Sequence, residues 1–212
     1  MQGKEAIVIA ITREFATLGS EVALAVAREL NLVPAHDEVI NAVAQRMNIS
    51  PSLLGRYMDG SADQLEVMAL DPARVAAYVS EQVFGFAAHG NRVISGCGAT
   101  YLLRVPAALL VRVRAAPAVR AGRLLEQHPA LEPGEAQRQI ALVDALQARN
   151  ALSLFNVLDA LDATSYDCIL DTGSDSVADC VAEVARLWRL GCHGELRKCP
   201  DRRASARLQL VL

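Results

Sequence analysis

Arginines at helical spacing are the side chains of this 212-residue chain that point most directly to chemistry. Arg120 and Arg123 lie three positions apart, so a helix places them on one face. Arg138 and Arg149 are separated by about three helical turns and also share a face. Arg13 directly follows an apolar run. Guanidinium groups gathered in this way can stabilise a phosphoryl group during transfer, and the alternative is that they cover solvated helix faces.

The segment 12–20 has the position of a phosphate-binding loop, because it joins a predicted strand to a predicted helix. Such a loop directs backbone N–H groups and a helix N-terminus at an anion. The segment lacks the pattern G-x-x-x-x-G-K-[ST], and the two lysines of the chain, Lys4 and Lys198, lie far from it. The sequence alone therefore leaves an ordinary strand-to-helix connection as the alternative.

The cysteines are weaker candidates for chemistry. Cys97 lies between two glycines, as a hydrolase nucleophile can, but no histidine completes a triad pattern and a buried thiol is favoured. Cys192, His193 and Cys199 could bind zinc, although no paired C-x-x-C motif accompanies them. The chain has five cysteines, an odd number, and three lie in apolar segments, which is typical of reduced thiols and predicts a cytoplasmic protein.

The composition is that of a folded domain with an aliphatic core. Hydrophobic residues make up 52% of the chain and aromatic residues 4%, which excludes intrinsic disorder. No apolar stretch approaches the roughly 20 residues that a bilayer requires, and the N-terminus has no signal-peptide pattern. Residues 189–212 hold six of the 21 Lys and Arg residues and two of the 24 Asp and Glu residues. The remaining body is therefore acidic, which argues against nucleic acid as a partner.

Alternating strands and helices must position these side chains. We expect core strands at 6–11, 92–95, 108–113 and 168–171, with a short extended piece at 32–35. Helices are expected between them, among them 117–127, 133–152 and 174–190, with start signals at Ser50-Pro51 and Asp71-Pro72. This alternation predicts a parallel α/β sheet, in which ligands bind at the carboxyl ends of the strands.

Six segments of the chain carry a family pattern in order and spacing. The first reads T-R-E-F-A-T-L-G-S-E over 12–21, followed by P-A-H-D-E-V-I over 34–40 and V-I-S-G-C-G-A-T-Y-L-L over 93–103. Then come Ala-Ala-Pro at 115–117 with Arg120, Asp144 with Arg149, and Y-D-C-I-L-D-T over 166–172. Together they resemble the cytidylate kinase-like family of P-loop kinases, over roughly residues 6–188.

The resemblance implies a three-layer α/β P-loop kinase fold, with a parallel sheet of about five strands, over residues 1–190. It implies a helical monophosphate-binding insertion at 41–90 and a lid region at 116–150. Residues 191–212 are predicted to form a basic, flexible tail that could contact a protein partner. No membrane partner is expected.

The resemblance also assigns roles in nucleotide binding. The residues expected to bind phosphate or nucleotide are Arg13, Ala16, Thr17, Leu18, Gly19, Ser20, Asp171 and Thr172. Ser20 could also ligate Mg²⁺. For Ser20, and for Asp171 with Thr172, the alternative is capping of a helix or turn.

The remaining roles concern the lid and the acceptor. Arg120, Arg123 and Arg149 would be lid arginines that hold the phosphates and stabilise their charge during transfer. Asp37 would help to place the acceptor, and its alternative is the N-cap of a helix. The acceptor would also contact Gly96 and Cys97.

Three departures from the family pattern bear on activity. Ala16 and Leu18 replace glycines that would allow positive φ, and Cys97 replaces an arginine that would fork onto a monophosphate. The first hypothesis is a nucleoside monophosphate kinase-like phosphotransferase that moves the γ-phosphoryl group of ATP, with Mg²⁺, to CMP or a similar small acceptor. The alternative is a catalytically impaired module for nucleotide sensing or protein interaction.

Overall fold

A parallel five-stranded sheet lies at the centre of the computed structural model, which describes residues 8–105 and 108–192. The strand order is β2-β3-β1-β4-β5, and every pairing is parallel. The strands are β1 (Val8–Arg13), β2 (Val33–Pro34), β3 (Arg92–Ser95), β4 (Ala108–Arg114) and β5 (Cys168–Asp171). This is the parallel α/β architecture that the sequence predicts.

The central strand β1 is apolar on both faces because helices cover both sides of the sheet. Its residues 8–11 are at most 2% exposed. Val8 and Ala10 pack into one hydrophobic cluster, and Ile9 and Ile11 pack into the other. The continuous apolar run is therefore explained by two cores that share one strand.

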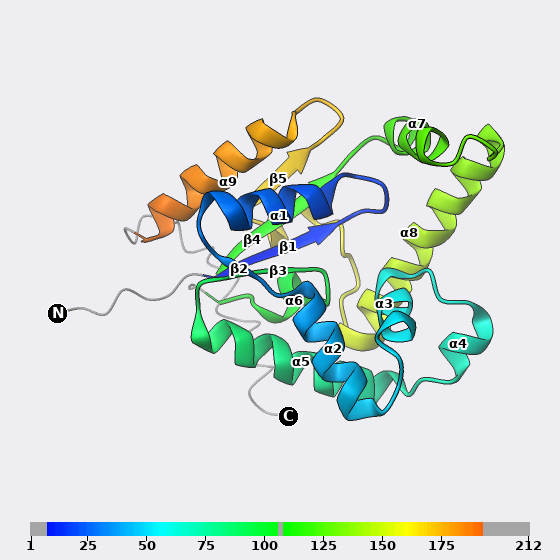
Figure 1. The fold of residues 1–212 in the computed structure, drawn as a ribbon, viewed down its shortest axis with the longest axis horizontal. Coiled ribbons are helices and arrows are strands. Elements are labelled where there is room, and N and C mark those ends of the chain that lie inside the picture. The colour runs from blue at the N-terminus through cyan, green and yellow to red at the C-terminus, as the bar shows by residue number, and fades with distance from the viewer. Residues whose placement is uncertain (1–7, 106–107, 193–212) are drawn as a thin grey trace.

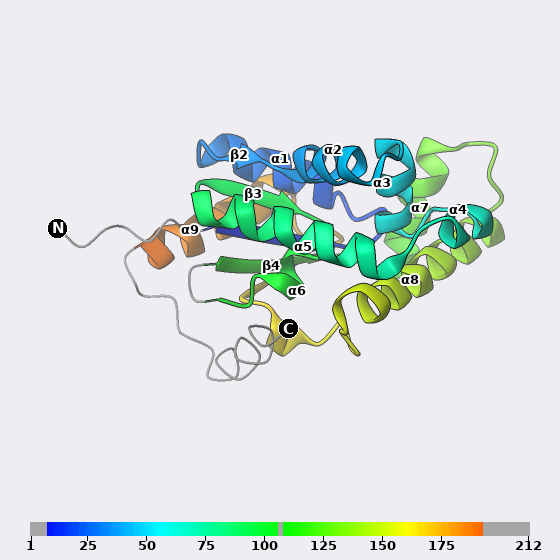
Figure 2. The same ribbon diagram turned by 90° about the horizontal axis from the view of Figure 1, so that it is seen from below.

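The helices form the outer layers. They are α1 (Gly19–Glu29), α2 (His36–Met47), α3 (Pro51–Asp59), α4 (Gln64–Met68), α5 (Pro72–His89), α6 (Ala99–Leu102), α7 (Pro117–Gln127), α8 (Pro133–Phe155) and α9 (Val177–Cys192), with a 3₁₀ turn at Ala163–Ser165. Helices α1 and α9 cover one face of the sheet, and α2 and α5 cover the other (Figure 1). Figures 1 and 2 both show α3, α4, α7 and α8 beyond the ends to which the strands point, where a ligand is expected.

Several boundaries agree with the sequence predictions. Strands β3 and β5 and helix α7 coincide with the predicted ranges. Ser50 and Asp71 cap α3 and α5 as expected, since their side chains accept hydrogen bonds from the N–H groups of Leu53 and Ala73. Helix α9 begins at Val177, later than predicted. Ser176, the residue before it, exchanges hydrogen bonds with Asp179 of the first turn and so marks the start of the helix.

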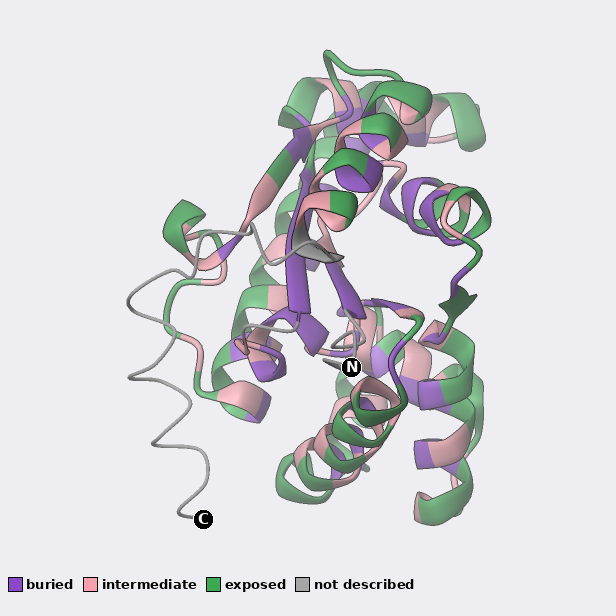
Figure 3. Ribbon diagram, turned by 90° about the vertical axis from the view of Figure 1, so that its left-hand side faces the viewer, coloured by how far each residue is buried: buried purple, intermediate pink, exposed green. Residues whose placement is uncertain are grey.

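Figure 3 shows the burial pattern that follows, with buried strands between helices whose outer sides are exposed.

No helix among the described residues is both long and apolar enough to cross a bilayer. The predicted tail lies, from residue 193 onward, outside the described residues, and so do two of the three candidate zinc ligands.

Gly98 is the position where the fold depends most directly on a missing side chain. Its φ is +66°, and an added Cβ would lie 2.3 Å from the Phe155 ring at the end of α8. We expect Gly98→Ala to lower the free energy of unfolding by about 2–3 kcal/mol, through left-handed strain and overpacking. Urea denaturation measures this change.

Gly85→Ala is the matched control, because a Cβ at Gly85 meets nothing within 4 Å on helix α5. This variant should gain about 0.5–1 kcal/mol, since alanine is the better helix former. If the two variants had the same stability, Phe155 would not constrain the turn at Gly98.

Candidate functional site

The loop between β1 and α1, residues 13–20, has a glycine-type backbone at two positions that carry side chains. Ala16 and Leu18 both have a φ of +60°. For an L-residue this conformation costs roughly 1–2 kcal/mol, and glycine avoids the cost. The loop thus adopts the conformation that glycines would favour, although only Gly19 remains of the glycines in the family pattern.

The same loop presents a row of unpaired backbone donors. In the described part of the chain, no acceptor bonds to the N–H groups of residues 16–21. The first backbone hydrogen bond of helix α1 runs from Val22 N–H to the Leu18 carbonyl at 3.0 Å. Consecutive free N–H groups at a helix N-terminus form a site suited to an anion such as phosphate.

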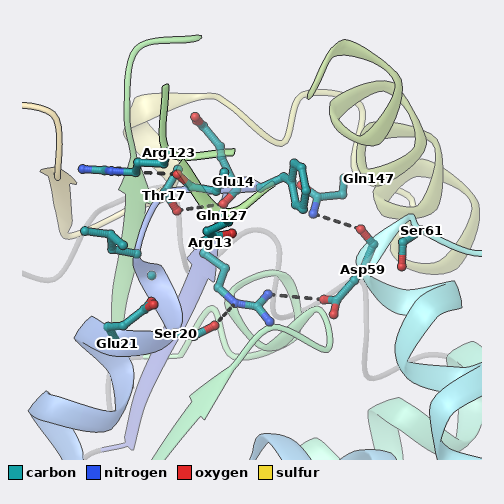
Figure 4. Close-up of a pocket in the computed structure, with 14 residues that line it drawn as sticks. Arg13, Glu14, Thr17, Ser20, Glu21, Asp59, Ser61, Arg123, Gln127 and Gln147 are labelled. Carbon is teal, nitrogen blue, oxygen red and sulfur yellow. Dashed lines mark hydrogen bonds and ion pairs between the residues drawn. The ribbon is translucent and has the colours of Figure 1, made fainter. Parts of the chain in front are cut away.

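A cavity of about 320 Å³, the loop cavity, lies against these donors. Its lining residues are Arg13, Glu14, Phe15, Ala16, Thr17, Leu18, Gly19, Ser20, Glu21, Asp59, Ser61, Arg123, Gln127 and Gln147. Arg13 Nε donates to Ser20 Oγ at 2.9 Å, and its guanidinium pairs with Asp59 at 3.3 Å (Figure 4). Gln147 of α8 donates to the Asp59 carbonyl at 3.1 Å. The end of α3 and the middle of α8 therefore meet at the loop.

Arg123 carries a positive charge that no carboxylate compensates within the described residues. Its guanidinium donates to the Ala16 carbonyl at 3.4 Å and to Thr172 Oγ1 at 3.1 Å, and also to the Thr172 carbonyl. The Thr172 hydroxyl in turn donates to the Thr17 carbonyl at 2.5 Å. Arg123 and Thr172 thus fix the outer side of the loop, and the Arg123 charge remains available to a ligand.

An ion chain of two buried arginines and two partly exposed carboxylates holds the loop on its inner side: Arg112, Glu14, Arg120 and Asp144. Glu14 pairs with Arg112 of β4 and lies 3.9 Å from Arg120 Nε. Arg120 is 4% exposed and forks onto Asp144, with both N–O distances 2.8 Å. The hydrogen bonds that it donates to Asp144 raise the pKa of the Arg120 guanidinium. Both arginines are thereby matched by carboxylates.

A smaller cavity of about 60 Å³, the small cavity, adjoins the loop cavity and shares Arg13, Asp59 and Gln147 with it. Gly96 and Cys97 line it, as the acceptor assignment expects. Cys97 is 5% exposed, and burial, with the nearby Asp59 charge, raises the pKa of its thiol to about 12. His36 Nδ1 donates to the Ser95 carbonyl at 2.7 Å and so cannot take a proton from the thiol. The interpretation of Cys97 as a buried thiol is confirmed.

Three predicted residues lie apart from both cavities. Arg120 is enclosed in the ion chain, and Arg149 is exposed on α8 without a hydrogen bond or ion pair to any described residue. Asp37 is exposed in the first turn of α2, whose N-cap position is Ala35, so the alternative cap role of Asp37 is wrong. The assignment of these three residues to the site stays a prediction.

Two further alternatives concern capping. Leu18, not Ser20, occupies the N-cap position of α1, so Ser20 is free of the cap role. Asp171 accepts from Gly173 N–H at 2.9 Å and pairs with Arg114 at 3.3 Å, which makes it a turn-forming residue. Thr172, its neighbour, does reach the loop.

Sequence reasoning missed Asp59 and Gln147. Asp59 is the last residue of α3, before Gly60 with its φ of +77°, and a C-capping glycine is a recognisable helix end. That signal places Asp59 at a helix terminus, but only the packing of α3 on α8 brings it to Arg13. Among the described residues, no group of three or more His, Cys, Asp or Glu side chains is arranged to hold a metal ion by itself.

Comparisons with known proteins agree with this architecture. The sequence model of the cytidylate kinase-like family matches residues 8–174. No curated protein matches the chain in sequence. An uncharacterised protein from Eubacterium ventriosum is similar in structure, with a TM-score of 0.61 at 18% identity over 85% of this chain and 97% of its own.

Two other solved structures are similar at lower scores. The YorR protein of Bacillus subtilis, solved in complex with phosphorylated GDP, has a TM-score of 0.50 at 14% identity and covers 88% of this chain and 98% of its own. Shikimate kinase from Bacteroides thetaiotaomicron has a TM-score of 0.49 at 17% identity, with 87% and 99% covered. At these identities the likeness concerns the fold.

Asp144→Asn tests the ion chain. The substitution leaves the Arg120 charge buried without its main partner, so the free energy of unfolding should fall by about 3 kcal/mol. Glu183→Gln is the control, because it removes an exposed carboxylate that pairs with Arg186 and should change stability little. Urea denaturation measures the free energy of unfolding of both variants. An equally small decrease in both would contradict a structural role for the ion chain.

Leu18→Gly tests the backbone strain in the loop. Removing the side chain relieves the left-handed conformation, so the free energy of unfolding should rise by about 0.5–1 kcal/mol. The same substitution at Leu24, which is 47% exposed on helix α1, should lower it by about 1 kcal/mol. Thermal denaturation of both variants reports the sign, and a loss at both positions would show that Leu18 is not strained.

Proposed function

Because this chain belongs to the cytidylate kinase-like family and has the P-loop kinase fold, we propose that it is a phosphotransferase that binds a nucleoside triphosphate, with ATP the expected donor, on the 13–20 loop. It would transfer the γ-phosphoryl group to a small acceptor. The observation that carries the proposal is the row of free N–H groups over residues 16–21, beside the uncompensated Arg123 charge.

Each part of the site then has a role in binding or in charge stabilisation. The free N–H groups and the N-terminus of α1 would bind phosphate oxygens of the donor. Arg123 would stabilise the charge that spreads over the transferred group, as phosphoryl transfer requires positioning and cations more than covalent chemistry. Thr172 holds both the loop and Arg123 and is therefore a positioning residue.

A magnesium ion fits the donor set of the loop cavity. Ser20 and Glu21, which would hold it, place a hydroxyl and a carboxylate at the cavity, and Mg²⁺ prefers oxygen ligands together with substrate phosphates and water. When bound, the ion neutralises charge on the donor phosphates. The protein residues present would hold it jointly with the donor, since they are too few for a separate metal site.

The impaired module is the second candidate, and it rests on Ala16, Leu18 and Cys97. All three have positive φ values, of +60°, +60° and +52°, so the replacements keep the backbone that glycine or a turn would give. For Ala16 and Leu18, this backbone favours a loop that still binds phosphate, which weighs against the impaired module. CMP is the acceptor that the resemblance implies.

Calorimetric titration with Mg-ATP tests the proposed function. We expect micromolar binding by the wild-type protein, and Arg123→Gln should weaken it about 10- to 100-fold, because a charge-assisted contact is lost. Arg138→Gln is the control, since it removes an equal charge from an exposed position on α8 away from the loop cavity. Circular dichroism verifies that both variants fold.

Two results would contradict the proposal. Absence of wild-type binding at millimolar Mg-ATP would favour the impaired module. Equal weakening by the two arginine variants would show that general positive charge, and not the position of Arg123, determines affinity.

A further inference from the structure

The small cavity is placed to receive the acceptor if the proposed function is correct. It lies against the Gly96–Gly98 turn, the end of α3 and the middle of α8, and it shares Arg13, Asp59 and Gln147 with the loop cavity. An acceptor must approach the γ-phosphate in line with the leaving oxygen. A cavity that shares lining residues with the donor cavity can bring the acceptor close to the transferred group.

The charged side chains of the small cavity cancel one another. Its lining includes Arg13 and Asp59 as charged residues, and these two pair at 3.3 Å. Cys97, also in the lining, is a buried thiol. Arg112, the cation of the neighbouring strand β4, is bound to Glu14 in the ion chain. No cation lining this cavity is therefore left without an acidic partner to receive a phosphate dianion.

The lining also offers the hydroxyl groups of Thr12 and Tyr101 and three side-chain oxygens that accept no described hydrogen bond. Gln147 donates its side-chain nitrogen to the Asp59 carbonyl at 3.1 Å, and Asn150 donates its own to the Tyr57 carbonyl at 2.6 Å. The side-chain oxygens of Gln147 and Asn150 accept no hydrogen bond from any described residue. The second carboxylate oxygen of Asp59, Oδ2, also has no partner among the described residues. These three oxygens can accept hydrogen bonds from a ligand that carries hydroxyl groups.

We propose that the acceptor is a small neutral polyhydroxyl compound, a sugar or polyol, and that Asp59 binds its reacting hydroxyl. Hydroxyl groups donate to carboxylate and amide oxygens, whereas phosphate oxygens would meet three acceptors and a carboxylate charge. The proposal rests on the proposed function and narrows its acceptor class. It disfavours CMP.

The transfer step follows from this arrangement. The acceptor oxygen forms a bond to the γ-phosphorus, and the bond from that phosphorus to the β–γ bridging oxygen breaks. The hydroxyl proton passes to the Asp59 carboxylate. The products are a phosphate monoester and a nucleoside diphosphate, so Asp59 is a catalytic residue that contacts the acceptor.

Matched pairs of probes test the acceptor class: ribose with ribose 5-phosphate, glycerol with glycerol 3-phosphate, and cytidine with CMP. The full-length protein is first loaded with a non-hydrolysable ATP analogue, and each probe is titrated by calorimetry. We expect a neutral member to bind at least tenfold more tightly than its phosphorylated partner. Asp59→Asn should reduce this preference at least tenfold, because it frees the Arg13 charge for phosphate.

Transfer from radiolabelled ATP provides a second readout. Asp59→Asn should reduce phosphorylation of the best neutral probe by about 100-fold without weakening ATP-analogue binding, because the variant frees the Arg13 charge beside the loop cavity. Asp63→Asn is the control, because Asp63 is exposed, lines neither cavity and can still cap α4 as asparagine. This control should retain wild-type transfer and preference.

The outcomes separate the two proposals. If the ATP analogue binds but phosphorylated probes bind as tightly as neutral ones, or no neutral probe binds, the neutral-acceptor proposal is overturned and the phosphotransferase proposal stands. An unchanged preference in Asp59→Asn also overturns the role of Asp59. If the analogue itself does not bind, the proposed function fails, and the acceptor proposal fails with it.

Discussion

The site depends on the pairing of Glu14 with two buried arginines. Glu14 follows β1 directly, Arg112 belongs to β4, and Arg120 belongs to α7 and forks onto Asp144 of α8. Because a buried charge without a partner is costly, the four residues fix two helices against the end of the sheet. The next turn of each helix then supplies a cavity residue: Arg123 follows Arg120 by three positions, and Gln147 follows Asp144 by three.

This anchoring explains how a strained loop persists without the glycines of the family pattern. The Ala16 carbonyl accepts from Arg123, and the Thr17 carbonyl accepts from Thr172, so two fixed side chains hold the backbone on either side of the turn. Phe15 packs on the apolar cluster between α7 and α8. A conformation that costs free energy locally is retained when its surroundings determine it in this way. The carbonyls are used for anchoring, and the N–H groups are left for a ligand.

The sequence predicts the framework well because local patterns encode it. Short segments that contain adjacent branched apolar residues identify β3 and β5, and Pro117 identifies the start of α7. The 13–20 loop is predicted because its place after the first strand depends on topology alone. The pairing of Arg120 with Asp144 could not be predicted, since helical spacing gives the face of α7 but not its partner. The same holds for Asp59, because no local pattern encodes the packing of α3 on α8.

The two cavities share Arg13, Asp59 and Gln147 and differ in the groups that each adds to them. The loop cavity adds the free N–H groups and the Arg123 charge, whereas the small cavity adds Asn150 and the Gly96–Gly98 turn. Arg13 stands between them and is held by Ser20 on one side and Asp59 on the other. The loop cavity is therefore the better suited of the two to a phosphorylated molecule. Since the ion chain fixes both α7 and α8, the same four charged residues determine the geometry of both cavities.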